Sequence, residues 1–433
     1  MLYLLLALII ITAFFVTLEW PELGFGLVII IPLVKDLFQL PEDQIPFLNL
    51  LFLFAIFVLI AMLYKFSFKM NEVKLNREHL GLFIIFTAIL LFSLNYTNEL
   101  IYGADKVLKF ILFNGLYFIG GMIVFQYPIK QNRFIEFLKY SILTIAIINT
   151  IFLIKHFVSG TLLQHIMVRF TLLESNSPIS MARITGLGVL LWFIAAFQSK
   201  NSKNKLFASL AIIPLAVSLV ATNTRGPILF SLLLIFVFVF FYLKISMTKK
   251  LTFLGIFISI IIIFVLILPA NTFNRFLLLF HKASINANQS VWSAGSSARR
   301  VIFIKRLLVY LGQHPATLFI GSGAGSFADL FQDYGVCLYP HNLFFEVLFE
   351  QGLLGFTILI ISITILIRDI YIYYYKKGNM TNDILIFVFG FMYFFLNAMI
   401  SGDVDSNRIL WLFWGGIIGM IISQQNNIHK LEF

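Results

Sequence analysis

The sequence predicts an all-α, polytopic helical membrane protein with twelve or thirteen transmembrane helices and one long loop on the outer face. Three observations lead to this fold class. Of the 433 residues, 60% are hydrophobic and only 12% are charged, about half the charged fraction of an ordinary soluble domain. The 51 Phe, 16 Tyr and 5 Trp exceed what soluble cores of this size can hide. Apolar runs long enough to cross a bilayer recur along the whole chain.

Each predicted span is an apolar run that ends at polar or charged residues. The twelve spans lie near residues 2–18, 47–66, 80–96, 107–126, 138–157, 179–198, 205–222, 226–243, 251–270, 342–367, 383–400 and 408–423. A thirteenth candidate, residues 22–34, holds Gly24, Gly26 and Pro32, so a re-entrant or interfacial segment is the alternative. The first run has no basic region before it and no small-residue cleavage site, which favours a retained anchor over a signal peptide.

Short basic loops between the runs predict the orientation in the membrane. Sixteen Lys or Arg lie in five alternate loops, so these richer loops should be cytoplasmic. These loops are at residues 65–79, 127–139, 199–205, 244–250 and 368–382. Only five lie in the connections between them, at residues 97–106, 155–178, 222–225 and 401–408, which should be outer. The same alternation divides the chain into N-terminal helices (1–270), an outer loop (271–340) and C-terminal helices (341–433). The site of any chemistry then faces the periplasm or the exterior.

The charge pattern and the cysteine count exclude several classes of protein. The formal net charge is +11, but the cations lie in short clusters that set topology, so nucleic acid is not an expected partner. The single cysteine, Cys337, excludes an internal disulfide and a cysteine-based metal site. Within the outer loop, Ser296 to Leu311 has four cations on an apolar background and predicts an amphipathic helix on the membrane surface or over a cavity.

His341 is the first candidate for chemistry. Pro340 and Asn342 are residues that favour a helix start, so His341 should lie at the outer N-terminal end of a membrane helix. The helix dipole there disfavours a protonated imidazole, which favours a neutral His that can accept a proton. A His that merely caps the helix at the interface is the alternative. Gly352, three turns deeper, would let another segment approach.

Arg225 is the second candidate, and it lies at another outer helix start. Pro227 suits a first helical turn, and Thr224 or Asn223 can cap it. A cation at the positive end of a helix is mildly unfavourable unless an anion also binds there, so this broken rule indicates a site. The planar fork of Arg matches phosphate oxygens and makes it a good diphosphate clamp. An Arg that reaches to lipid headgroups is the alternative.

Other charged and glycine-rich positions are weaker candidates. The run from Gly321 to Gly325 resembles a phosphate-binding loop, but no Lys-Ser/Thr follows it and a tight turn is the favoured role. Glu346 and Glu350 lie one turn apart in a membrane segment, where acids are functional candidates by default. Arg169 and Arg183 are outer-side cations that could contact an anionic ligand. The group Asp403, Asp405 and Arg408 could pair internally, and His79 and His429 lie on the predicted cytoplasmic side.

Together these residues resemble the bacterial O-antigen ligase and polymerase superfamily of polytopic membrane glycosyltransferases. The resemblance rests on Arg225-x-x-x-Leu229 at an outer helix start, on the outer-loop motif Gly321-x-Gly323-x-Gly325-x-Phe327, and on His341-Asn342 with Gly352 and Gly355 beyond. The motifs span residues 222 to 355, and the first 200 residues match in hydropathy alone.

The resemblance implies a GT-C-like fold in the cytoplasmic (inner) membrane. It implies glycan transfer from an undecaprenyl-diphosphate-linked donor to a glycan or lipid-glycan acceptor, without cofactor or metal and with inversion at the anomeric carbon. Membrane lipids and other polysaccharide-assembly proteins are the further partners, in lipopolysaccharide or capsule synthesis. The residues that would bind substrate or act on it are His341 and Arg225 as catalytic groups and Arg299, Arg300, Arg169, Arg183, Glu346 and Asn342 as substrate-binding groups.

Two questions stay open at this level. Ligase and polymerase share these motifs, and polymerase is only slightly favoured. A multi-pass transporter or flippase of a lipid-linked glycan is the alternative from another class, although it would be expected to place polar groups near the midplane of several helices. A membrane scaffold is a third interpretation, but it would give Arg225 and His341 no role.

Overall fold

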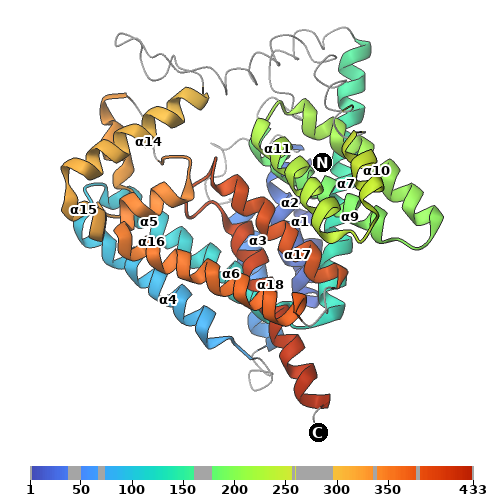
Figure 1. Ribbon diagram of the computed structural model, residues 1–433, viewed down its shortest axis with the longest axis horizontal. Helices are drawn as coiled ribbons and strands as arrows, with labels where there is room; N and C mark the ends of the chain where they lie inside the picture. The colour runs from blue at the N-terminus through green and yellow to red at the C-terminus, as the bar shows by residue number, and fades with distance from the viewer. Residues whose placement is uncertain are drawn as a thin grey trace. The chain divides into compact units, whose positions relative to one another are not determined.

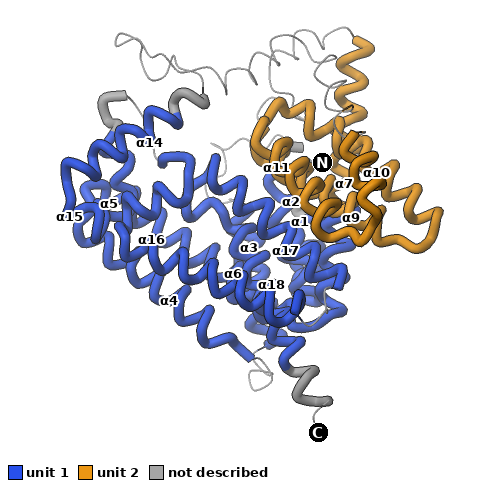
Figure 2. The backbone as a smooth tube through the Cα atoms, in the orientation of Figure 1, with its two compact units in different colours: residues 1–140, 300–433 blue, residues 141–299 orange. Residues whose placement is uncertain are grey.

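The structure is a computed structural model that describes residues 2–37, 50–66, 74–159, 178–255, 259, 296–334, 339–376 and 381–431. Every regular element in this part of the chain is a helix (Figure 1). Contacts divide the chain into two compact units, which Figure 2 colours separately: unit 1 comprises residues 1–140 and 300–433, and unit 2 comprises residues 141–299. Each unit is described by itself, and the predicted domain limits at residues 270 and 341 stay predictions.

Unit 1 holds the N-terminal and C-terminal helices. They are α1 (Leu2–Glu19), α2 (Pro21–Leu37), α3 (Leu50–Phe66), α4 (Arg77–Phe92), η2 (Ser93–Tyr96), α5 (Leu100–Lys109), η3 (Phe110–Asn114), α6 (Gly115–Val124), α15 (Pro315–Ile320), η5 (Ser326–Tyr334), α16 (Leu343–Ile370), η6 (Tyr371–Tyr375), α17 (Asn382–Ala398) and α18 (Arg408–Leu431). Residues 300–313 of α14 (Ser296–Gln313) and residues 128–140 of α7 (Pro128–Val158) also belong to it.

Unit 2 holds the middle of the chain. Its helices are the remainder of α7, α9 (Pro178–Gln198), α10 (Ser202–Ala221), α11 (Arg225–Val237) and η4 (Phe238–Tyr242). Residues 251–255 of the predicted span at 251–270 are helical, and most of that span lies outside the described residues. The same holds for residues 271–295 of the predicted outer loop.

Seven helical segments in the described part of the chain are long and apolar enough to cross a membrane. They are Arg77–Tyr96, Leu100–Val124, Pro128–Val158, Pro178–Gln198, Ser202–Ala221, Arg225–Tyr242 and Leu343–Tyr375. Four shorter apolar helices accompany them, at Leu8–Glu19, Pro21–Leu33, Leu50–Phe66 and Asn382–Ala398. The all-helical membrane fold is therefore confirmed, while the number of spans stays a prediction. The thirteenth candidate is a continuous helix, α2, with Pro32 inside it.

Close backbone contact between α6 and α18 forms the middle of unit 1. A Cβ atom at Gly419 would lie 2.5 Å from the carbonyl oxygen of Met122, so only glycine allows this approach. Small residues at helix crossings are the usual solution where lipid supplies no hydrophobic drive between helices. Trp411 of α18 then packs edge-on against Phe110 and Phe118 at centroid distances of 5.3 and 6.0 Å. These ring contacts join α18 to η3 and α6.

The loops of unit 1 that were predicted to be outer gather at one end, which we call the His341 end. Thr97 donates from its hydroxyl to the carbonyl oxygen of Ala324 at 2.7 Å. Asn342 donates from its amide to the carbonyl oxygen of Met399 at 2.9 Å. Three loops far apart in sequence thus meet there, which agrees with the predicted alternation of sides.

The opposite end of unit 1, the Arg368 end, joins two loops predicted to be cytoplasmic. Arg368 Nη2 lies 2.7 Å from Glu78 Oε2, and His79 Nε2 lies 3.1 Å from Asp369 Oδ2. These contacts tie the start of α4 to the end of α16. His79 therefore has a structural partner at the end that is predicted to be cytoplasmic.

Candidate functional site

His341 lies directly before α16, where the sequence predicts the helix start. Asn342 is the N-cap residue, and its Oδ1 accepts hydrogen bonds from the backbone N–H groups of Phe344 and Phe345, both at 3.0 Å. Such a cap satisfies amides of the first turn that have no partner inside the helix. The backbone of His341 has a φ of +59°, a conformation that non-glycine residues rarely adopt. The capped turn therefore holds the imidazole outside the helix proper.

The imidazole of His341 is packed between aromatic rings. Tyr339 meets it edge-on at a centroid distance of 4.5 Å, and Phe303 of α14 lies parallel to it at 6.3 Å. Phe303, Leu307 and Leu311 are buried and recur at helical spacing, so they form the inward stripe of the predicted amphipathic helix. Arg300 lies one turn before Phe303 on this stripe. The structure thus brings Arg300 and His341 to the same part of unit 1.

The glycine run of the outer loop is bonded to α16. Gly352 has a φ of +66° and a ψ of −167° inside this helix, a combination open essentially only to glycine. It interrupts the helical hydrogen bonds, and the carbonyl oxygens of Phe349 and Glu350 instead accept from the N–H groups of Ser322 and Gly323 at 2.8 and 3.0 Å. These loop amides are occupied, so the run is a docking turn. The expectation that Gly352 lies on a regular helical face is wrong, and the expectation of a close approach there is confirmed.

A buried ion cluster lies below this turn and was missed in the sequence. Lys106 of α5 forms ion pairs with Glu346 and Glu350 of α16; its Nζ lies 2.8 and 2.7 Å from the two carboxylate oxygens of Glu350. Lys106 is 2% exposed, and both glutamates are fully buried. The sequence predicts a connection between helices at residues 97–106; this is wrong for residues 100–106, which belong to the apolar helical segment Leu100–Val124, and the predicted outer side stays a prediction.

Asp403 and Asp405 lie in the loop between α17 and α18, at the same end. Burial works to raise the pKa of Asp403, but Lys106 and hydrogen bonds from Ser406 outweigh it and hold this pKa below its usual value. Burial and the negative charge of Asp403 raise the pKa of Asp405 to about 7. Arg408, grouped with these acids in the sequence, lies over the ring of Phe113 at 5.5 Å.

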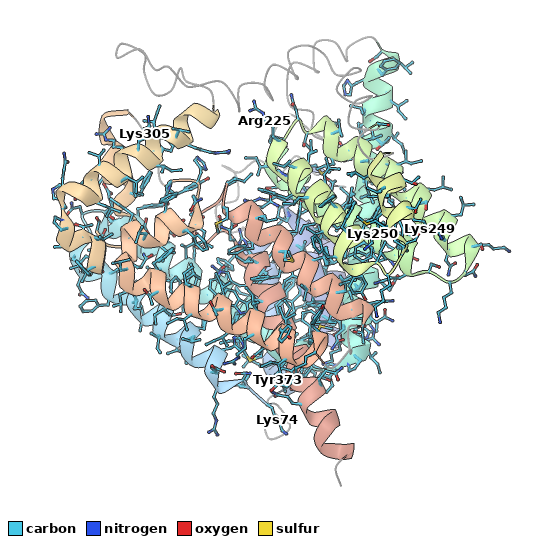
Figure 3. All side chains as sticks on the ribbon, in the orientation of Figure 1. Lys74, Arg225, Lys249, Lys250, Lys305 and Tyr373 are labelled. Carbon is cyan, nitrogen blue, oxygen red and sulfur yellow. The ribbon has the colours of Figure 1, made fainter. Side chains whose placement is uncertain are left out.

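Arg225 begins α11 (Figure 3), and this helix belongs to unit 2. Thr224 occupies the N-cap position, but its side chain makes no capping bond, so the expected cap is wrong. Its hydroxyl instead approaches the carbonyl oxygen of Pro178 at 3.2 Å, which places the starts of α9 and α11 side by side. Arg183 lies in the second turn of α9. Unit 2 therefore presents two of the predicted cations at one end.

The predicted site residues fall into three groups. Arg300, His341, Asn342 and Glu346 belong to unit 1, and Arg183 and Arg225 belong to unit 2. Arg169 lies outside the described residues, and Arg299 is in the first turn of α14 with its side chain outside them. The catalytic roles of Arg225 and His341 stay predictions. Among the described residues, no group of three or more His, Cys, Asp or Glu could hold a metal ion.

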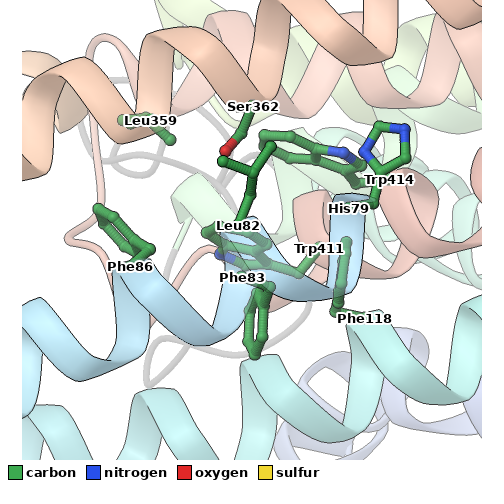
Figure 4. Close-up of a pocket in the computed structure, with 9 residues that line it drawn as sticks. All are labelled: His79, Leu82, Phe83, Phe86, Phe118, Leu359, Ser362, Trp411 and Trp414. Carbon is green, nitrogen blue, oxygen red and sulfur yellow. The ribbon is translucent and has the colours of Figure 1, made fainter. Parts of the chain in front are cut away.

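A small cavity lies elsewhere in unit 1, between α4, α6, α16 and α18 (Figure 4). Its lining is His79, Leu82, Phe83, Phe86, Phe118, Leu359, Ser362, Trp411 and Trp414. Two of the lining side chains are already engaged, because His79 pairs with Asp369 and the Ser362 hydroxyl donates to the carbonyl oxygen of Ile358 at 2.7 Å. None of these lining residues is a predicted site residue, and the His341 end stays the candidate site of unit 1.

The fold and the site define a class: a multi-helix membrane protein with cations, an imidazole and buried acids gathered at helix ends. Residues 209–360 match the family model described as O-Antigen ligase. The chain is also 25% identical over 367 residues to an O-antigen polymerase of Salmonella muenchen, and the alignment covers 80% of each protein. The resemblance that the motifs indicated is confirmed. The matched segment contains Arg225, Arg300, His341, Asn342 and Glu346.

Proposed function

We propose that the protein is a glycosyltransferase that moves a glycan from an undecaprenyl-diphosphate carrier to a sugar acceptor on the outer face of the cytoplasmic membrane. The chain would cross this membrane twelve or thirteen times. The observation that carries the proposal is the placement of His341. His341 precedes a capped membrane helix, and its ring packs parallel to Phe303 of α14, the helix that also carries Arg300. Both His341 and Arg300 lie within the segment that matches the O-antigen ligase family model.

The proposed reaction needs a base at the acceptor and cations at the leaving group. The acceptor hydroxyl oxygen bonds to the anomeric carbon while the bond from this carbon to the diphosphate oxygen breaks. The hydroxyl proton passes to the neutral imidazole of His341, as in general base catalysis. The leaving undecaprenyl diphosphate gains negative charge, which Arg225 and Arg183 of unit 2 and Arg300 of unit 1 would stabilise. One displacement of this kind inverts the anomeric centre.

The names of the relatives leave the acceptor open between two choices. The family model is described as a ligase, and the Salmonella relative is named a polymerase. A polymerase would transfer a growing chain to another lipid-linked repeat unit, whereas a ligase would transfer a finished glycan to a terminal acceptor. The extent of similarity to the polymerase, over 80% of the chain, favours polymerisation. A transporter of lipid-linked glycans is not favoured, because neither comparison points to one.

The proposal is tested by complementation of a deletion strain that lacks its own copy of this protein. We expect His341→Ala and Arg225→Ala to abolish surface glycan, because loss of a general base costs roughly 10²–10⁴-fold in rate. The glycan is read by gel, the lipid-linked pool by mass spectrometry, and the protein by its level in membranes. Accumulation of single lipid-linked repeats would indicate a polymerase, and accumulation of long lipid-linked chains would indicate a ligase.

Two exposed residues supply matched controls. His314, before α15, and Lys305, on α14 (Figure 3), are exposed. We expect His314→Ala and Lys305→Ala to support normal glycan. Normal glycan from both His341→Ala and Arg225→Ala, at wild-type membrane levels, would overturn the proposed roles of these residues.

A further inference from the structure

Lys106 forms buried ion pairs that join the start of α16, the helix that follows His341, to α5, which lies outside the segment matched by the family model. Its ammonium group bonds both Glu346 and Glu350, which lie one turn apart on α16. All three side chains are at most 2% exposed. A lysine buried in a membrane segment is costly, so its position between two carboxylates requires an explanation beyond hydrophobic packing.

The cluster also fixes the loop between α17 and α18. Besides Lys106, Glu346 Oε1 accepts a hydrogen bond from the backbone N–H of Val404 at 3.2 Å. The carbonyl oxygen of Val404 in turn accepts from Asn114 Nδ2 at 2.8 Å. Asn114 lies within Leu100–Val124, the same continuous helical segment that carries Lys106. Charge pairs and hydrogen bonds therefore link Leu100–Val124, the start of α16 and this loop into one polar network.

The network reaches His341 through the first turn of α16. The N–H of Glu346 donates to the carbonyl oxygen of Asn342 at 3.0 Å, so Glu346 closes the turn that Asn342 caps. Asn342 is also bonded to Met399, at the start of the same loop. The residue next to Asn342 is His341, with its uncommon positive φ. Hydrogen bonds on both sides of this turn therefore restrain the backbone next to His341, the residue that would accept the proton.

A buried ion pair is weak support for stability, because well-packed apolar residues often stabilise a protein as much or more. Its distinct property is geometric, since an ammonium between two carboxylates fixes the distance between helices and the rotation of each. We propose that Lys106 is a positioning residue: through Glu346 and Glu350 it holds the start of α16 and the 401–407 loop in the register that fixes His341. The positioning is structural, and its consequence for catalysis rests on the proposed function.

Four sets of variants separate positioning from simple loss of folding. Lys106→Met leaves two buried carboxylates without their counterion and is expected to reduce the membrane level. Lys106→Met with Glu346→Gln and Glu350→Gln removes all three charges at similar volume, so we expect this triple variant to fold. Lys106→Arg keeps the charge. The pair Lys106→Glu with Glu350→Lys exchanges the partners and is expected to restore part of what each single change loses.

Two readouts are needed. The first is steady-state transfer with detergent-purified full-length protein and a lipid-linked substrate. We expect the triple variant to lose roughly 10- to 100-fold in kcat with little change in KM, because small misplacements of reacting groups have effects of this size.

The second readout is the mobility of a nitroxide label at His341→Cys in a Cys337→Ser background. The label is then specific to one position, because the chain has one cysteine. We expect the label to become more mobile in the triple variant.

The two readouts also separate this inference from the proposed function. A folded triple variant with wild-type kcat and unchanged label mobility would overturn the positioning role of Lys106. A transfer activity that survives His341→Ala would overturn the role of His341 in catalysis, while the label would still report whether Lys106 fixes residue 341. Recovery of kcat and of label immobility in the charge-exchanged pair would support positioning through the ion pairs.

Discussion

Asp405 gives the His341 end a dependence on pH near neutrality. Burial and the charge of Asp403 raise the pKa of Asp405 to about 7, whereas an aspartate in the unfolded chain titrates near 3.9. The folded protein therefore holds a proton that the unfolded chain has lost. Its contribution to stability is complete below about pH 4 and is lost as the pH rises to about 7.

We expect Asp405→Asn to remove this dependence. The amide cannot ionise, so the variant should be more stable than wild type at pH 8, on the order of 1 kcal/mol after allowance for partial exposure. The difference should shrink toward pH 4. Thermal unfolding of both proteins in detergent between pH 4 and pH 8 measures it. Parallel pH profiles for the two proteins would contradict the raised pKa.

Residues whose environment is local were predictable from the sequence, and residues whose partners are remote were not. Asn342 was identified because a capping residue bonds amides two and three positions ahead. Lys106 was missed because its partner Glu350 is 244 residues away. The one available signal was chemical: a lysine inside an apolar helix needs a carboxylate, and Glu346 and Glu350 were the acids in a membrane segment.

At the scale of helices, the break in α16 decides how the outer loop is held. A Cβ atom at Gly352 would lie 2.5 Å from the N–H nitrogen of Gly321 and would also meet the carbonyl oxygen of Phe319. We expect Gly352→Ala to destabilise the protein by about 1–3 kcal/mol from backbone strain alone. The clash with the docked loop adds to this loss. Glycan synthesis should fall with it, because the loop carries α14 over His341.

Gly81 is a matched control for this prediction. It lies inside α4, and a Cβ atom there would meet nothing within 4 Å. Alanine is the better helix former by roughly 0.5–1 kcal/mol, so Gly81→Ala should be neutral or slightly stabilising. Membrane level and thermal stability in detergent measure both variants. Equal stability of Gly352→Ala and wild type would mean that α16 can close into a regular helix without loss.

Helix limits show where hydropathy reasoning loses information. The predicted span at 107–126 begins seven residues earlier, at Leu100, because Asp105 and Lys106 indicate a loop when only charge is considered. In the structure Lys109 pairs with Asp105 at 2.5 Å, one turn away, and Lys106 pairs with α16. Pairing lets charged residues remain within a helix, and pairing over long range cannot be read from a hydropathy window.

At the scale of the whole molecule, the contacts within unit 1 and the charge bias of its loops together predict its orientation in the membrane. The His341 end gathers loops with few cations, and the Arg368 end gathers loops rich in them. Because loops rich in Lys and Arg stay in the cytoplasm, the Arg368 end is predicted to face the cytoplasm. The contacts alone show that the loops alternate between ends, and the charge bias alone gives the direction.

Single cysteines in a Cys337→Ser background measure this direction in cells. Ser406 at the His341 end, Lys74 at the other end of unit 1, and Lys203 of unit 2 are all exposed. We expect Ser406→Cys to react with a membrane-impermeant maleimide from outside, and Lys74→Cys and Lys203→Cys to react only after permeabilisation. Reaction from outside at Lys74→Cys but not at Ser406→Cys would contradict the predicted orientation and place the site on the cytoplasmic face. The proposed lipid-linked donor would then have to be used before it is translocated.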